Sequence, residues 1–127
     1  IVKPPYGRIT AIDMNSGEIA WRVANGDADP QVENHPALAG IDLPPLGGGG
    51  RHPILVTATL LIHGQQQGDD YVLVARDKRT GSEIATLPLP GRPRGAPMTY
   101  ALDGRQFVSI SVGSEPTPQL LTLALPD

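Results

Sequence analysis

Cysteine is absent from the 127 residues of the chain, which excludes disulfide bonds and thiolate metal sites. Aromatic residues are scarce at 4%, and Trp21 is the only tryptophan. The longest apolar stretch, residues 54–62, is too short to span a bilayer. No signal peptide is recognisable, and the sequence opens as "IVKPPYG" without an initiating methionine. We therefore expect these residues to be a segment of a longer protein.

Positive charge is also in short supply. Ten lysine and arginine residues stand against 13 acidic ones, which gives a formal charge of −3. The basic residues are scattered, and no basic stripe is interleaved with aromatic residues. Nucleic acid is therefore not an expected partner.

Glycine and proline, by contrast, are abundant. The chain has 15 glycines and 14 prolines, about 23% of its residues and close to twice their usual share. So many residues that break regular structure favour short strands and turns, and they argue against a helical bundle. Residues 24–53 hold five of the prolines and a run of four glycines, and they show no regular period. We expect them to form a long connector.

Alternating and β-branched runs predict strands throughout the rest of the chain, with no convincing helix. Asp103-Gly104 is a strong hairpin signal, and Gly17 suits a turn after the first strand. The segment "HGQQQGDD" (63–70) is predicted to be a polar turn. The expected strands are Arg8–Asp13, Glu18–Val23, Ile54–Ile62 (one strand or a pair), Tyr71–Arg76, Glu83–Leu89, Met98–Leu102, Gln106–Val112 and Gln119–Leu125.

Two of these segments form a repeat. The residues that recur at one constant offset are Ala11, Asp13 and Gly17, matched by Ala75, Asp77 and Gly81. With one inserted residue after the second glycine, "EIAW" (18–21) matches "EIAT" (83–86), so Ala85 or Thr86 takes the place of Trp21. Units of about four strands that recur along a chain indicate the blades of a β-propeller.

We therefore predict an all-β chain that forms about two to three four-stranded antiparallel blades of a propeller. In this hypothesis residues 1–23 are the outer half of one blade, and residues 24–53 are the Pro/Gly-rich connector. Residues 54–90 form a second blade, and residues 91–127 form an incomplete last blade.

The pattern Ala-x-Asp-x-x-x-Gly-x-x-x-Trp, formed by Ala11, Asp13, Gly17 and Trp21, resembles the tryptophan-docking motif of the quinoprotein alcohol dehydrogenases. These are eight-bladed β-propellers that bind pyrroloquinoline quinone (PQQ). "NHPAL" (34–38), "APMTY" (96–100), "GRQFV" (104–108) and the terminal "ALPD" follow in the order of that family's C-terminal part. The resemblance thus covers nearly the whole chain. The subgroup it indicates is that of the membrane-type glucose, quinate and polyol dehydrogenases.

The resemblance implies that the intact protein is a periplasmic oxidoreductase that uses PQQ and calcium. Its substrate would be an alcohol or hemiacetal carbon of a sugar or polyol, and a quinone would accept the electrons. The family's calcium ligands and catalytic base lie in earlier blades, so we expect no catalytic or metal-binding residue in this chain, and no cofactor or activity in the isolated chain. The alternative is a non-catalytic propeller of the same repeat type, either a scaffold or a sugar-binding module.

The docking motif also has a physical interpretation. Asp13 can cap the turn through its side chain, and Gly17 lets the chain reverse. Trp21 offers a large flat surface that a neighbouring blade can cover, so that the indole would act as a rivet between blades. A buried aromatic residue of an ordinary β-sandwich is the simpler alternative.

Asp70 is the one candidate for contact with the cofactor. In the glucose-dehydrogenase-like members, an aspartate implicated near PQQ stands seven residues before the aspartate of the docking motif. Asp70 stands seven residues before Asp77. An exposed turn at "GDD" (68–70) is the alternative.

The three histidines, His35, His52 and His63, lack the spacing of metal ligands, and we expect surface or loop roles for them. The segment "LGGGGRH" (46–52) lacks the Lys-Ser/Thr of a phosphate-binding loop, so a pliable connection is expected there.

An incomplete propeller exposes apolar faces and unpaired strand edges, both of which favour pairing with another chain. We therefore expect the isolated chain to self-associate.

Overall fold

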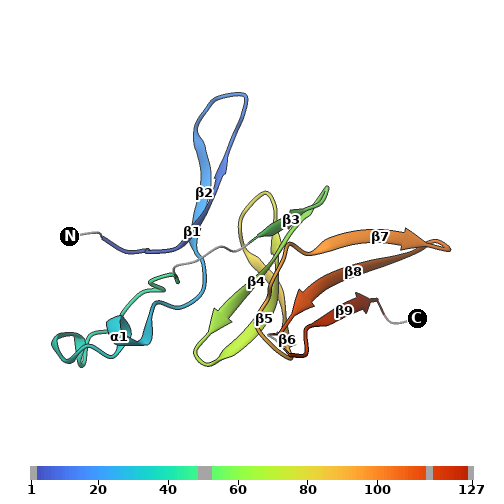
Figure 1. Cartoon of the computed structure of the whole chain (residues 1–127). Coiled ribbons are helices and arrows are strands. Elements are labelled where there is room, and N and C mark those ends of the chain that lie inside the picture. Colours follow the sequence, from blue (N-terminus) through green and yellow to red (C-terminus); the bar gives the residue numbers. More distant parts are fainter. Residues whose placement is uncertain (1–2, 49–52, 114–115, 126–127) are drawn as a thin grey trace.

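The computed structural model describes residues 3–48, 53–113 and 116–125. These residues form nine antiparallel strands in three sheets (Figure 1), which confirms the all-β prediction. The first sheet contains β1 (Arg8–Ile12) and β2 (Ile19–Ala24). The second contains β3 (Ile54–Val56), β4 (Leu60–Gln67), β5 (Asp70–Asp77) and β6 (Glu83–Leu89). The third contains β7 (Met98–Leu102), β8 (Arg105–Val112) and β9 (Gln119–Ala124).

The second sheet differs from the sequence-based expectation at one end. The apolar run does divide into a strand pair, because Thr57 Oγ1 accepts a hydrogen bond of 2.9 Å from the backbone N–H of Leu60 and closes a turn. The predicted polar turn at residues 63–70 is wrong. Residues 63–67 continue β4, and only Gly68 and Asp69 make the turn. These polar residues belong to the strand because the backbone ladder between β4 and β5 continues as far as the Gln67–Asp70 pair.

The connector contains two short helical turns that the sequence pattern did not predict, α1 (Pro30–Glu33) and the 3-10 turn Pro36–Leu38. Local chemistry explains α1. Its N-cap, Asp29, accepts a hydrogen bond of 2.8 Å from the backbone N–H of Gln31, and proline occupies the first helical position. A single turn is too short to show a helical period, so hydrophobic periodicity does not reveal it.

The far end of the connector returns to the segment before β1. Tyr6 N–H donates to the carbonyl of Leu46 at 2.6 Å, and Gly48 N–H donates to the carbonyl of Asn25 at 2.8 Å. A Cβ on Gly7 would meet the backbone of Gly48, and a Cβ on Gly47 would meet the backbone of Gly7. Glycine is thus required where two backbones cross, and the connector is tied to the base of the first hairpin.

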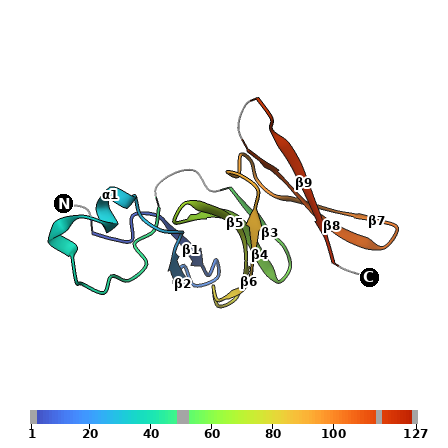
Figure 2. The same ribbon diagram turned by 90° about the horizontal axis from the view of Figure 1, so that it is seen from below.

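The three sheets follow one another in chain order, with the second between the other two (Figure 2). The apolar core lies between the second and third sheets and is centred on Ile62, Leu73, Leu89, Ile110 and Val112. The opposite face of the second sheet, toward the first sheet, mixes apolar with polar side chains. Its buried members are Leu61, His63, Gln65, Val72, Val74 and Arg76. The two joints between sheets therefore differ in chemistry.

Candidate functional site

The β1–β2 and β5–β6 turns have the same geometry. Asp13 Oδ1 accepts a hydrogen bond from the backbone N–H of Asn15 at 2.8 Å, and Asp77 Oδ1 accepts one from Arg79 N–H at 2.8 Å. Gly17 and Gly81 both have a φ of +75°, in the left-handed region that favours glycine. In each turn the aspartate side chain and the glycine backbone hold the reversal together.

Strand pairing shows which residue stands in the place of Trp21 in the second unit. Ala11 pairs with Trp21 and Ala75 pairs with Ala85, and in both ladders the register shifts directly after the alanine. The constant offset therefore continues through the glycine into the next strand. The assumption of one inserted residue after the second glycine is wrong. Ala85, not Thr86, occupies the position of the tryptophan.

The Asp77 carboxylate is stabilised by its own turn. Backbone N–H groups of Thr80 (3.0 Å) and Arg79 (2.8 Å) donate to Oδ1. These hydrogen bonds, with the Thr80 bond as the larger cause, lower the pKa of Asp77 below its usual 3.8. The charged form of Asp77 is thus the one that fits this turn.

The indole of Trp21 lies against the β5–β6 turn of the second sheet. A Cβ on Gly81 would come within 2.7 Å of Trp21 Cε3, so the ring occupies the space that any other residue at position 81 would need. Trp21 Nε1–H donates to the carbonyl of Lys78 at 3.0 Å. Lys78 is itself fixed to the β3–β4 turn, because its backbone N–H donates to Thr59 and its Nζ donates to the Thr57 carbonyl. The ring therefore joins the first sheet to the β5–β6 turn, which Lys78 in turn ties to the β3–β4 turn.

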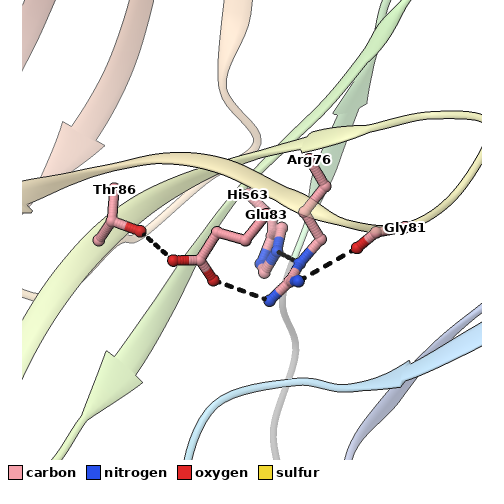
Figure 3. Close-up of polar contacts among 5 residues, drawn as sticks. All are labelled: His63, Arg76, Gly81, Glu83 and Thr86. Atoms are coloured by element: carbon pink, nitrogen blue, oxygen red, sulfur yellow. Dashed lines mark hydrogen bonds and ion pairs between the residues drawn. The ribbon is translucent and has the colours of Figure 1, made fainter.

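A buried arginine lies on the same face of the second sheet, beside Gly81 (Figure 3). Arg76 donates through Nε to His63 Nε2 at 3.2 Å, through Nη1 to the Gly81 carbonyl at 3.2 Å, and through Nη2 to Glu83 Oε2 at 3.4 Å. Glu83 Oε1 in turn accepts from the Thr86 hydroxyl at 2.6 Å. We call these five residues the Arg76 network. It borders a cleft of about 500 Å³ between the first and second sheets.

Sequence reasoning missed this network. His63 was expected on the surface or in a loop, but it is a fully buried residue of β4. The sequence did hold a signal for this burial, because alternate residues of a strand lie on the same face of the sheet. Arg76 shares a face with Val72 and Val74, and His63 is the ladder partner of Val74, so both polar residues stand at positions where the strand buries its side chains. His35 lies in the connector, where its Nδ1 accepts from Ala37 N–H, and His52 lies outside the described residues.

Asp70 is exposed at the first position of β5, directly after the β4–β5 turn. The connector reaches this turn through Asp27, whose Oδ2 accepts a hydrogen bond of 2.7 Å from the backbone N–H of Gly68. Asp27 N–H also donates to the Gln66 carbonyl at 3.4 Å. The structure therefore brings two acidic residues, Asp27 and Asp70, to one end of the second sheet.

Across residues 3–48, 53–113 and 116–125, no three His, Asp or Glu side chains gather in a group that could hold a metal ion. In the same part of the chain, no helix has the length and hydrophobicity needed to cross a bilayer.

Comparison with known proteins agrees with this geometry. The family described as "Glucose/ethanol/alcohol dehydrogenase, beta-propeller domain" (PQQ) matches residues 1–108. The quinate/shikimate dehydrogenase (quinone) of Acinetobacter baylyi is 34% identical over 87% of this chain, which spans 14% of that protein. The glycerol dehydrogenase large subunit of Gluconobacter oxydans is 36% identical over 98% of this chain, which spans 17% of that protein. The crystal structure of the quinohemoprotein alcohol dehydrogenase from Comamonas testosteroni superposes with a TM-score of 0.52 and 30% identity, over 84% of this chain and 12% of that one. The chain therefore belongs to the β-propeller domain family of the PQQ glucose, ethanol and alcohol dehydrogenases.

Proposed function

We propose that the intact protein carrying these residues is a PQQ-dependent dehydrogenase that oxidises the alcohol or hemiacetal carbon of a sugar or polyol. The observation that carries the proposal is the repeated Asp–Gly turn with Trp21 seated on the second copy, in a chain that the propeller family matches over residues 1–108. The named relatives are quinate/shikimate and glycerol dehydrogenases, of which the chain spans 14% and 17%. In this proposal the three sheets are scaffold, and Trp21 is a rivet between two blades.

When bound, PQQ would accept one hydride equivalent, that is two electrons and a proton, from the substrate carbon, with calcium held by residues outside this chain. In this proposal, Asp70 is the one residue of the chain that lies near the cofactor. Asp70 stands at an exposed sheet end, and the Asp27 contact fixes the turn that precedes it. A carboxylate there can neutralise a cationic side chain that faces the quinone, and so position that side chain. We place the intact protein in the periplasm, with a quinone as electron acceptor.

An Asp70→Asn variant of the intact protein tests this role. Because asparagine keeps the shape of aspartate and removes its charge, we expect kcat/KM for the best substrate to fall about tenfold or more, the loss typical of an outer-shell partner. The urea midpoint of unfolding should stay close to that of the unmodified protein, since Asp70 is exposed. The matched control is Asp69→Asn, one residue earlier in the same exposed turn. Equal activity losses in the two variants would contradict a specific role for Asp70.

The proposed activity itself is tested with the intact protein reconstituted with PQQ and calcium. Dye reduction is measured with a panel of sugars, polyols and simple alcohols. We expect reduction that requires both PQQ and at least one member of the panel. Failure to bind PQQ, together with no reduction by any alcohol, would favour the non-catalytic scaffold or sugar-binding module instead.

We also propose that the isolated 127-residue chain self-associates. Large apolar side chains are exposed on the outer face of the first sheet, at Ile12 and Ile19, and on the third sheet, at Met98, Tyr100 and Leu102. In the part of the chain that the structure describes, β1 and β9 each pair on one side only, so both leave an edge to which another strand could bond. Multi-angle light scattering at micromolar concentrations should give a mass above 13.4 kDa. A single monomeric peak across the concentration range would count against this expectation.

A further inference from the structure

An apolar cleft lies between the second and third sheets, on the face of the second sheet opposite the Arg76 network. Its volume is about 300 Å³. Ala75, Ala85 and Leu87 line one side, and Val108, Leu123 and Leu125 line the other. Ladder pairing places Ala75 directly opposite Ala85 on one face of the second sheet, so two small side chains stand together in the wall of the cleft.

The preceding unit shows what fills the equivalent place. Trp21 has the same ladder position on β2 that Ala85 has on β6, each opposite an alanine and each next to the same register shift. The ring of Trp21 points toward the second sheet and lies on Gly81. Ala85 likewise faces the next sheet in the chain, since it lines the cleft together with β8 and β9 residues. Ala85 thus leaves open, in the wall of the cleft, a ladder position that an indole fills in the preceding unit.

We infer that this cleft is a binding site for a flat, apolar, aromatic molecule of about the size of indole. The volume supports the assignment, because an engineered apolar cavity of about 150 Å³ is enough to bind benzene, and small-molecule sites begin at about 300 Å³. The chemistry of the walls supports it as well. The six residues named above all have aliphatic side chains, so an apolar ligand that enters covers apolar surface and leaves no polar side chain of these residues without water.

Among the described lining residues, the polar side chains are those of Thr57, Thr59 and Gln106. Thr57 Oγ1 is already bonded within the β3–β4 turn, and Gln106 Nε2 donates to Thr99 Oγ1. The ligand class is therefore a ring system with no more than one polar group, and it excludes sugars, polyols and anions. The site is distinct from the sugar or polyol site proposed above.

The test uses the intact protein and 5-fluoroindole, observed by ¹⁹F NMR, with unlabelled indole as competitor. We expect saturable line broadening that indole reverses. An Ala85→Trp variant should fill the cleft with its own indole, raise the unfolding midpoint and weaken 5-fluoroindole binding about tenfold or more. The matched control, Ala39→Trp, places the same side chain on an exposed connector residue and should leave binding unchanged.

Three results would overturn the inference. The first is broadening that unlabelled indole does not reverse. The second is equal binding by the unmodified protein and the Ala85→Trp variant. The third is no saturable broadening with the unmodified protein. If the unfolding midpoint of Ala85→Trp is lowered as well, other parts of the intact protein already occupy the cleft.

Discussion

Replacement of Trp21 with alanine is expected to lower the free energy of unfolding of the intact protein by about 3 kcal/mol, the lower end of the range for a large aromatic side chain in a core. The lower end applies because the residue is half-buried. The loss has two parts. The ring leaves the Gly81 surface, and the carbonyl of Lys78 loses the donor that Trp21 Nε1 supplies at 3.0 Å. Urea unfolding followed by circular dichroism measures the sum.

The two parts can be separated. Trp21→Phe keeps a flat ring but removes the N–H donor, and we expect it to cost about 1 kcal/mol for the hydrogen bond, plus some loss of contact area. Gly81→Ala attacks the same contact from the other side, because its Cβ would stand 2.7 Å from the ring. Gly104→Ala is the matched control. It has nearly the same φ, +79°, and open space around it, so it should cost only the backbone strain of about 1 kcal/mol. Equal costs at positions 81 and 104 would contradict the contact.

Loss of the Arg76 side chain is expected to be at least as damaging. Arg76→Met keeps the aliphatic length but removes three donors at once, from His63 Nε2, the Gly81 carbonyl and Glu83. The arginine side chain is only 10% exposed. A buried polar group that loses its hydrogen-bond partner typically costs about 1–3 kcal/mol, and both His63 Nε2 and the Gly81 carbonyl lose the Arg76 donor, so we expect a loss of about 3 kcal/mol or more. Urea unfolding of the intact protein measures this change.

The hydrogen bonds, and not the ion pair, should account for most of that cost. The Glu83 side chain is 44% exposed and its contact with Arg76 is long, at 3.4 Å, so solvent screens the pair. We therefore expect Glu83→Gln to cost less than about 1 kcal/mol. Adding His63→Val to Arg76→Met should recover part of the loss, because the imidazole nitrogen that loses its Arg76 donor is replaced by an apolar group. A Glu83→Gln variant as unstable as Arg76→Met would contradict this partition.

Gly81 connects the two predictions. Its carbonyl accepts a hydrogen bond from Arg76, and the indole of Trp21 packs against its Cα, so Gly81 takes part in both contacts. Effects of substitutions that share a partner are generally not additive. The combined Trp21→Ala and Arg76→Met variant should therefore lose less stability than the sum of the two single variants.

Much of the fold was predictable from the sequence, and the reasons are local. Alternation predicted β1, β2 and β5–β9 to within one or two residues, and the Asp–Gly spacing predicted the repeat. The end of β4 was not predicted, because Gln65 and Gln66 have the composition of a turn although they lie in a complete ladder. The turn α1 was missed because one helical turn has no period to detect.

The site was harder to predict than the fold. The contact between Trp21 and Gly81 joins residues that are far apart in the sequence, and only the resemblance to the tryptophan-docking motif indicated such a role. The network around Arg76 depends on which face of a strand is buried, and that depends on the neighbouring sheet. The place of Ala85 required the strand register, because a comparison of letters matched "EIAW" to "EIAT" one residue too late.

The two joints of the chain should respond to different extents to cooling. The second and third sheets are held by aliphatic side chains, chiefly around Ile62, Leu73 and Ile110, and hydrophobic association weakens as the temperature falls. The first and second sheets are joined by the Trp21 hydrogen bond, with the Arg76 hydrogen bonds supporting the turn on which the indole lies, and hydrogen bonds do not share that dependence. On cooling, the joint between the second and third sheets should therefore weaken more than the joint that Trp21 makes.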